Sequence, residues 1–519
     1  MKTTTKVPLQ AFLFIALLLV VLAGCNNQPG NKQSTDKTPG GDTSLQLLSE
    51  TNMKEDLSIL FTAFKDIHPA YGLYTPDDSM ANLYHRIAGT LQQPMSEDEF
   101  MTAISPLVSA LKCGHTQVKH SAGYKPYTGD KTFRLPFKVL VQDNKAWVTY
   151  HQAKALSTGD ELLSVNNIPV AAIIQHGGDL YAMDGNNHTF KELFLSEYDG
   201  FEDACNKYYR WKPPYNIRIR TKDGSEKSVT VDTVSSKMPL AEQMKEIDNY
   251  DTWVVSRKTG YLPLRYLPNA SVACFEVHTY QYEDTAIYQK AFREIHEKGI
   301  RNLIIDLRHN TGGDIRIAAK LVTYLADAPF QMVGDVWSRV PDPTKTPFER
   351  YFDHEISGSF SQSFKPRNIK TDGHYQVAFQ PVFGDLMGNT KLASADHYTG
   401  NLFVLIDGAT FSSGAHTAAA IKQHCRKAIF IGRETGGGSE GCSGGTTQHL
   451  TLPHTGIQVD FPLLRLVSVL KHPVKGRGIL PDKTVHFTPA DIVTHNDPDL
   501  KAAINMIDNS ALLSGKSIH

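Results

Sequence analysis

The sequence predicts an α/β fold built from three successive parts. Residues 250–487 alternate short apolar strands with amphipathic helices, a pattern typical of a layered α/β core. Residues 45–124 carry apolar side chains at helical spacing, and residues 125–237 show mostly the patterns of strands and tight turns. The chain has 519 residues, 41% hydrophobic and 21% charged, a composition that supports packed domains and excludes disorder as the main state.

The first 25 residues carry the features of an export segment. Lys2 and Lys6 precede an apolar run from Ala11 to Ala23, which is too short to span a bilayer comfortably. The run ends in a Leu-Ala-Gly-Cys sequence at Cys25, which resembles a bacterial lipobox. The resemblance implies that residues 1–24 are a signal peptide and that the Cys25 thiol is lipidated. A plain signal peptide and a buried helix are the alternatives.

Residues 25–44 are expected to form a flexible tether, because they are rich in small and polar residues and have no apolar period. No second hydrophobic span follows, so we expect membrane contact through the lipid anchor only, in the bacterial cell envelope outside the cytoplasm. The 53 Lys and Arg balance 54 Asp and Glu, which disfavours nucleic acid as a partner. Six cysteines are too few for a disulfide scaffold.

Residues 45–124 are predicted to form a helical N-terminal domain. Leu57, Leu60 and Phe64 share one face at helical spacing. Ser96 and the Glu three residues later form a capping box that opens another helix. Gly114 is predicted to end that helix, immediately before a histidine.

Residues 125–237 are predicted to form a β-rich module. Asp143-Asn144 and Asp223-Gly224 are typical hairpin turns. The segment Gly159–Asn167 resembles the closing half of a PDZ domain, which implies a PDZ-like module interrupted by an aromatic-rich insertion at Tyr181–Tyr215. A generic β-rich accessory domain is the alternative.

A polar loop follows the apolar strand Leu303–Ile305 within residues 250–487. The loop contains Gly312 and Gly313, and paired glycines let backbone N–H groups approach an anion closely. Residues 340–392 are Pro-rich and weakly periodic, so we expect an insertion there. A C-terminal helix is expected within residues 488–519.

A second strand, Leu402–Ile406, leads into the turn Asp407–Gly414, which opens a helix. A serine at such a turn is exposed, and free N–H groups at the helix start can stabilise an oxyanion. Ser412 and Ser413 could equally act only as helix caps. No Gly-x-Ser-x-Gly motif is present, which disfavours the α/β-hydrolase fold.

Five segments in order resemble the C-terminal processing (tail-specific) serine peptidases, which have a ClpP/crotonase-like catalytic core. They are the helix end KCGHT, the strand and loop LIIDLRHNTGGD, the turn DGATFSSGA, and the later segments GRETGGG and GRGILPD. The helical part followed by a PDZ-like module also matches the family's domain order. The resemblance implies a peptidase catalytic domain at residues 250–487, a polypeptide substrate and no cofactor.

The resemblance assigns roles to individual residues. Ser412 matches the nucleophile, and the N–H of Ser413 with that of Gly312 or Gly313 matches the oxyanion hole. The family's Ser/Lys branch places a lysine 25 residues after the nucleophile, where this chain has a glycine. The tricorn-like branch instead takes a histidine from the N-terminal region, which makes His115 the expected base. A structural histidine packed between domains is the alternative.

The residue that would orient His115 stays unassigned. The tricorn-like branch implies a glutamate where Lys475 stands, and Glu434 and Glu440 are weaker candidates. Lys475 and Lys422 could serve as alternative bases, but the interpretation of both as solvated surface lysines is favoured. Cys113, His115 and His120 lack the spacing of a zinc site, so we expect no metal.

Two functions remain open from sequence. One is a serine endopeptidase that cleaves unfolded polypeptides or protein tails through an acyl-enzyme. The other is a catalytically inactive peptide-binding or scaffold lipoprotein on the same fold, which the missing lysine and glutamate favour.

Overall fold

The computed structural model describes residues 46–125, 134–233, 252–268, 270–353, 356–393, 395–446 and 448–513. The predicted signal peptide, the tether and Cys25 lie outside the described residues. Apart from Gln46 and Lys125, all described residues belong to one compact unit. No helix among them combines the length and the apolar character needed to cross a membrane.

A seven-stranded sheet forms the centre of the predicted α/β core, in the order β21-β16-β15-β11-β10-β9-β8. The strands from β10 to β21 pair in parallel, whereas β9 and β8 add antiparallel at one edge. Their bounds are β8 Val254–Val255, β9 Leu264–Leu267, β10 Val272–Glu276, β11 Asn302–Asp306, β15 Asn401–Ile406, β16 Ala428–Gly432 and β21 Lys483–Thr484.

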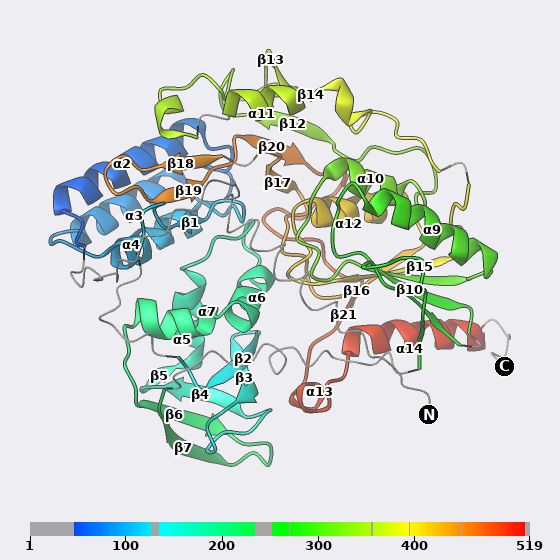
Figure 1. The fold of residues 1–519 in the computed structure, drawn as a ribbon, viewed down its shortest axis with the longest axis horizontal. Helices are drawn as coiled ribbons and strands as arrows, with labels where there is room; N and C mark the ends of the chain where they lie inside the picture. The colour runs from blue at the N-terminus through cyan, green and yellow to red at the C-terminus, as the bar shows by residue number, and fades with distance from the viewer. Residues whose placement is uncertain are drawn as a thin grey trace, which may run out of the picture. The chain divides into compact units, whose positions relative to one another are not determined.

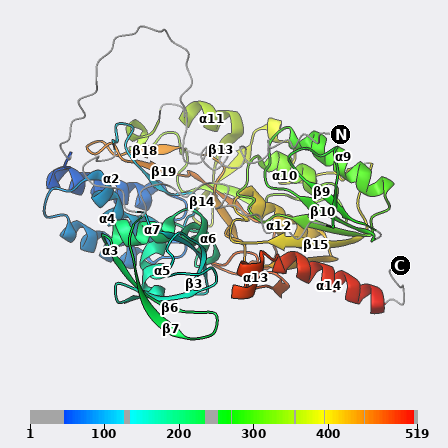
Figure 2. The ribbon, with the colours of Figure 1, turned by 60° about the horizontal axis from the view of Figure 1, so that its bottom comes forward.

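Helices cover both faces of this sheet, which confirms the predicted layered fold. Figure 1 shows α9 (Asp284–Glu297), α10 (Ile315–Val322) and α12 (Ser413–His424) on one side and α14 (Pro498–Leu513) on the other, and Figure 2 shows the same from a second angle. Alternate strand residues serve the two layers: Ile305 packs toward α9, α10 and α12, and Ile304 toward α14. Because the strands are parallel, their carboxyl ends lie together at one edge of the sheet.

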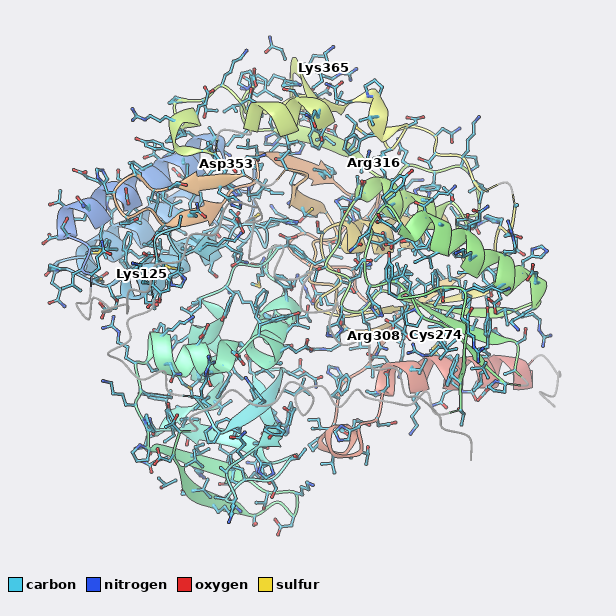
Figure 3. The ribbon with its side chains drawn as sticks, viewed as in Figure 1. Lys125, Cys274, Arg308, Arg316, Asp353 and Lys365 are labelled. Atoms are coloured by element: carbon cyan, nitrogen blue, oxygen red, sulfur yellow. The ribbon has the colours of Figure 1, made fainter. Side chains whose placement is uncertain are left out.

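Arg308, labelled in Figure 3, fastens the C-terminal segment to the end of β11. Its guanidinium contacts the carboxylates of Asp306 at 2.7 Å, Asp497 at 2.8 Å and Asp499 at 3.1 Å. Arginine suits this place because its planar fork can serve several carboxylates at once.

A second sheet of five antiparallel strands has the order β13-β14-β12-β20-β17. The region 340–392, predicted as an insertion, supplies β13 and β14 of this sheet together with the short helix α11 (Ile356–Ser363). The strands are β12 Asp335–Ser338, β13 Phe364–Thr371, β14 His374–Phe379, β17 Gly441–Gly444 and β20 Leu464–Val467.

The N-terminal helices are α2 (Glu50–Ile67), α3 (Asp77–Thr90) and α4 (Glu97–Ala110). The capping box predicted at Ser96 is present at the start of α4. The helices share one hydrophobic core with Leu450 and Phe461 from far along the chain. The short strand β1 (Val118–Lys119) also pairs with β19 (Gln458–Asp460), which pairs with β18 (His449–Thr451). Packing and strand pairing therefore join this part to the C-terminal third of the chain.

The β-rich module contains both predicted hairpins, at Asp143-Asn144 and Asp223-Gly224. The segment 181–215 forms two helices and a π-helical turn rather than strands. The module's strands are β2 Phe137–Gln142, β3 Lys145–His151, β4 Glu161–Val165, β5 Ile168–Pro169, β6 Tyr215–Arg220 and β7 Glu226–Val231, and its helices are α5 Val170–Gly178, α6 Thr189–Glu197 and α7 Gly200–Asp203. A short helix, α13 (Pro489–Thr494), precedes α14.

Candidate active site

Ser412 lies at the turn between β15 and α12, where the sequence analysis places it. Asp407 shapes this turn, because its Oδ1 accepts N–H bonds from Ala409 at 2.9 Å and Thr410 at 3.0 Å. Ser412 itself has φ 52° and ψ −124°, a conformation that L-residues rarely adopt. Such strain at a half-exposed serine is typical of a functional turn that aims the hydroxyl outward.

His115 reaches this hydroxyl from the N-terminal region. Its Nε2 lies 2.9 Å from Ser412 Oγ, and its ring packs on Phe411 with the ring centroids 4.5 Å apart. In the tautomer with the proton on Nδ1, the Ser412 hydroxyl donates to Nε2. The structure therefore brings together two residues that are 297 positions apart in the chain.

Gly114 does not end α4 as predicted. The helix ends at Ala110, and Lys112 adopts the left-handed conformation that terminates it, with φ 57°. Gly114 instead allows close packing, because a Cβ there would lie 2.7 Å from the ring of Phe411. A larger residue would push His115 away from the nucleophile turn.

Burial decides the proton affinity of His115. Desolvation lowers the pKa of its imidazole below the ordinary value of 6.5, and Asp184 and Asp460 oppose this while Arg465 adds to it. A neutral imidazole is the form that can accept a proton from serine. The Nδ1 atom is buried and has no hydrogen-bond partner among the residues that the structure describes.

The two predicted oxyanion glycines lie against the nucleophile turn. A Cβ on Gly312 would lie 2.8 Å from Ser412 Cβ and 3.0 Å from the backbone N of Ser413, and one on Gly313 would lie 2.7 Å from Tyr280 O. The N–H of Gly312 already donates to Asn310 Oδ1 at 2.9 Å. This favours Gly313, together with Ser413, as the pair of amide donors.

Neither glutamate considered as the orienting residue hydrogen bonds to His115. Glu434 pairs with Arg477 at 2.6 Å, and Glu440 accepts from Tyr74 at 3.1 Å and from the Gly476 N–H at 2.8 Å.

Neither lysine considered as an alternative base has an environment that suggests this role. Lys422 contacts Asp482 at 3.1 Å, and Lys475 is exposed. The position 25 residues after Ser412 is Gly437, where a Cβ would lie 2.4 Å from Ala415 Cβ. No room exists there for the lysine of the Ser/Lys branch.

The structure separates His120 from the residues with which it was considered as a metal ligand, since His120 pairs with Asp98 at 2.8 Å. Cys113, His115 and Asp184 instead present a sulfur, a ring nitrogen and a carboxylate oxygen within 4.8 Å of one another. Burial raises the pKa of the Cys113 thiol to about 12.

Asp184 and Arg465 were missed by the sequence analysis. Asp184 lies in the predicted aromatic-rich insertion, where no local pattern connects it to His115. Arg465 lies on β20 and is 5% exposed. The local sequence signal at Asp184 is the Gly-Asn-Asn run directly after it, which predicts a tightly folded loop. That signal does not predict which residues the loop contacts.

Comparison with known proteins relates part of the chain to a family of peptidases. Residues 271–485 match the model of peptidase family S41. The carboxy-terminal processing protease CtpB of Bacillus subtilis (strain 168) is 24% identical over 178 residues, which cover 32% of this chain and about a third (35%) of that protein's length.

Solved structures share the fold over most of the chain. The crystal structure of mature CPAF aligns with a TM-score of 0.56 at 16% identity, covering 88% of this chain and 96% of CPAF. The complex of mature CPAF with lactacystin aligns equally well, at 15% identity over 90% of this chain and 98% of that one. The match to peptidase family S41, a family of serine-type hydrolases, thus holds for residues 271–485, and the solved structures show that the fold is shared beyond that region.

Proposed function

We propose that this protein is a serine endopeptidase that cleaves unfolded polypeptides or protein tails through an acyl-enzyme. The observation that carries the proposal is the 2.9 Å contact between Ser412 Oγ and His115 Nε2 at a strained strand-to-helix turn. The similarity to a carboxy-terminal processing protease supports a polypeptide substrate.

The chemistry follows from the order of these groups. His115 Nε2 takes the proton of Ser412 as Oγ attacks the scissile carbonyl carbon. The N–H groups of Ser413 and Gly313 stabilise the resulting oxyanion, and one such donor is typically worth ~10²–10³ in turnover. The C–N bond then breaks, the amine leaves with the proton from His115, and water releases the acyl group by the same route in reverse.

Labelling with a fluorophosphonate tests the proposal. Wild-type protein is expected to react at Ser412 and to cleave unstructured casein, whereas Ser412→Ala abolishes both and His115→Ala reduces both by at least about 10³-fold. Ser228→Ala, at an exposed serine on β7 of the β-rich module, is the matched control. A folded wild-type protein that neither reacts nor cleaves is instead the inactive peptide-binding protein.

We also propose that Cys25 is lipidated and anchors the protein outside the cytoplasm in the bacterial envelope. Support comes from the sequence around Cys25 alone. Each buried CH₂ of an acyl chain contributes about 0.8 kcal/mol, so two or more chains give stable anchoring. Expression with radioactive palmitate is expected to label the wild type and not Cys25→Ala; equal labelling of both would contradict the anchor.

A further inference from the structure

We propose that Asp184 is the acidic positioning residue of the active site, acting on His115 from a segment inserted in the β-rich module. This rests on the proposed function, because it assigns the third member of the same catalytic group. A carboxylate oxygen of Asp184 lies within 4.8 Å of a ring nitrogen of His115, and Asp184 is 2% exposed. No glutamate takes that place, since Lys475 stands where the resemblance implies one.

Two backbone amides hold the Asp184 carboxylate in position. Its Oδ1 accepts the N–H of Gly114 at 2.8 Å, and its Oδ2 accepts the N–H of Gly438 at 3.3 Å. Gly114 directly precedes His115, and Gly438 belongs to the glycine-rich loop between β16 and β17. The carboxylate thus joins the segment that carries the base to a loop that follows the nucleophile helix.

The segment around Asp184 is threaded between other parts of the site. The Gly185 N–H donates to Lys112 O at 3.1 Å, and the Asn186 N–H donates to Gly476 O at 2.6 Å. A Cβ on Gly185, at φ +62°, would lie 2.6 Å from that same Gly476 oxygen. These contacts fix the position of Asp184 relative to His115. The inserted segment therefore has the role of holding a carboxylate near the base, which its sequence does not indicate.

Asn187 completes this attachment. Its Nδ2 donates to Gly436 O at 2.8 Å, and Asn187 is fully buried. Because the anchoring groups are mostly backbone atoms, the position of Asp184 does not depend on the rotamers of neighbouring side chains.

Several charged groups surround His115, but Asp184 differs from them in its partners. Asp184 and Asp460 raise the pKa of His115, and Arg465 lowers it, as burial does. Asp460 pairs with Lys119 at 2.8 Å and contacts His449 at 2.7 Å, whereas Asp184 has no such cationic side chain bonded to it among the described residues.

Asp184 forms no ion pair within 4 Å among the described residues, although its charge also raises the pKa of the buried Arg465. His416 and Cys113 also lie near His115, and burial keeps both uncharged: it lowers the pKa of His416 to about 4 and raises that of the thiol. A carboxylate this close to the base stabilises the imidazolium that forms when Ser412 loses its proton, and its bond to the Gly114 N–H positions the segment that carries the ring.

The test compares neutral and charged replacements in the full chain. Asp184→Asn and Asp184→Ser are expected to slow fluorophosphonate labelling by on the order of 10²-fold, less than the ~10⁴-fold of a directly bonded triad carboxylate. Both should also move the acidic limb of the pH–rate profile to lower pH, because loss of the negative charge lowers the pKa of His115. Asp184→Glu, which keeps the charge, should retain the wild-type limb.

Glu440→Gln is the matched control, because Glu440 is a nearby carboxylate bonded to Tyr74 and to a backbone N–H rather than to the base. A rate and a pH limb unchanged in both neutral variants would overturn the proposal, and so would an equal shift in Glu440→Gln. Histidine NMR titration, with His115→Ala for assignment, measures the same coupling without turnover. A shifted His115 resonance in unreactive wild-type protein would preserve the role of Asp184 and refute the peptidase.

Discussion

At the scale of single residues, the active site depends on two groups held in unfavourable states. Ser412 has a backbone conformation that costs an L-residue of order 1–3 kcal/mol. His115 is a partly buried imidazole, and desolvation lowers its pKa. The backbone strain of Ser412 and the desolvation of His115 both accompany one arrangement, in which the serine hydroxyl contacts a neutral imidazole.

The pH dependence of labelling follows from His115. Because its pKa lies below 6.5 and the neutral form is the proposed base, the acidic limb of the labelling rate should have its midpoint below pH 6.5. Fluorophosphonate labelling rates across the pH range of a folded enzyme measure this limb. A midpoint above 6.5 would show that the nearby carboxylates outweigh burial.

The strain at Ser412 predicts a gain in stability when the side chain is removed. Ser412→Gly is expected to raise the free energy of unfolding by about 1 kcal/mol over Ser412→Ala, because glycine adopts φ 52° without steric cost. Urea denaturation of the two inactive variants measures the difference. Equal stability would mean that the turn relaxes in solution.

At the scale of elements, His309 links the oxyanion loop to two neighbours. It lies in the loop after β11 with φ 58°, and its Nε2 lies 3.0 Å from Glu197 in α6 while its Nδ1 lies 2.9 Å from Asp407 in the nucleophile turn. The charge of Glu197 raises the pKa of His309 well above 6.5, and Asp407 adds to this. Burial alone would raise the pKa of Asp407, but His309 lowers it to about 2.

This bridge predicts a pH-dependent stability difference. Since the folded-state pKa of His309 is raised, its contribution is fully present below pH 6.5 and is lost as pH rises through that folded-state value. His309→Gln should therefore be less stable than wild type at pH 6, with the gap narrowing at alkaline pH. Melting temperatures of both proteins across this range decide; a gap independent of pH would exclude an ionic bridge.

At the scale of the whole molecule, long-range packing builds the site. The helices that lead to His115 share a core with Phe461, whose ring lies 5.7 Å from that of Phe64 and 5.4 Å from that of Phe352. The contact between Ser412 and His115 thus depends on a core to which residues of the N-terminal helices and of the C-terminal third both contribute.

Phe461→Ala should expose this dependence. Removing a fully buried ring is expected to cost about 3–5 kcal/mol of unfolding free energy, and thermal loss of fluorophosphonate labelling should move with the melting temperature. Tyr282→Ala, at a side chain that is 82% exposed, is the control and should change neither. Unchanged labelling after melting of the N-terminal helices would contradict a shared core.

The local patterns of this sequence specify what neighbouring residues can decide. The two hairpins at Asp143 and Asp223, the capping box at Ser96, the strand-to-helix turn at Ser412 and the alternation of strands with helices all follow from short-range propensity and period. The helix end was misplaced, because Lys112 rather than Gly114 adopts the left-handed conformation. Propensity alone cannot weigh that strain against packing on Phe411.

By itself the sequence determined the α/β class, the strand-to-helix turn at Ser412 and the resemblance to a peptidase family, because each depends on short runs of neighbouring residues. Only the tertiary structure decided how far His115 lies from Ser412 and that Asp184 approaches the base. These relations join residues that are far apart along the chain. Their distances are fixed by the simultaneous packing of several elements, which no local pattern encodes.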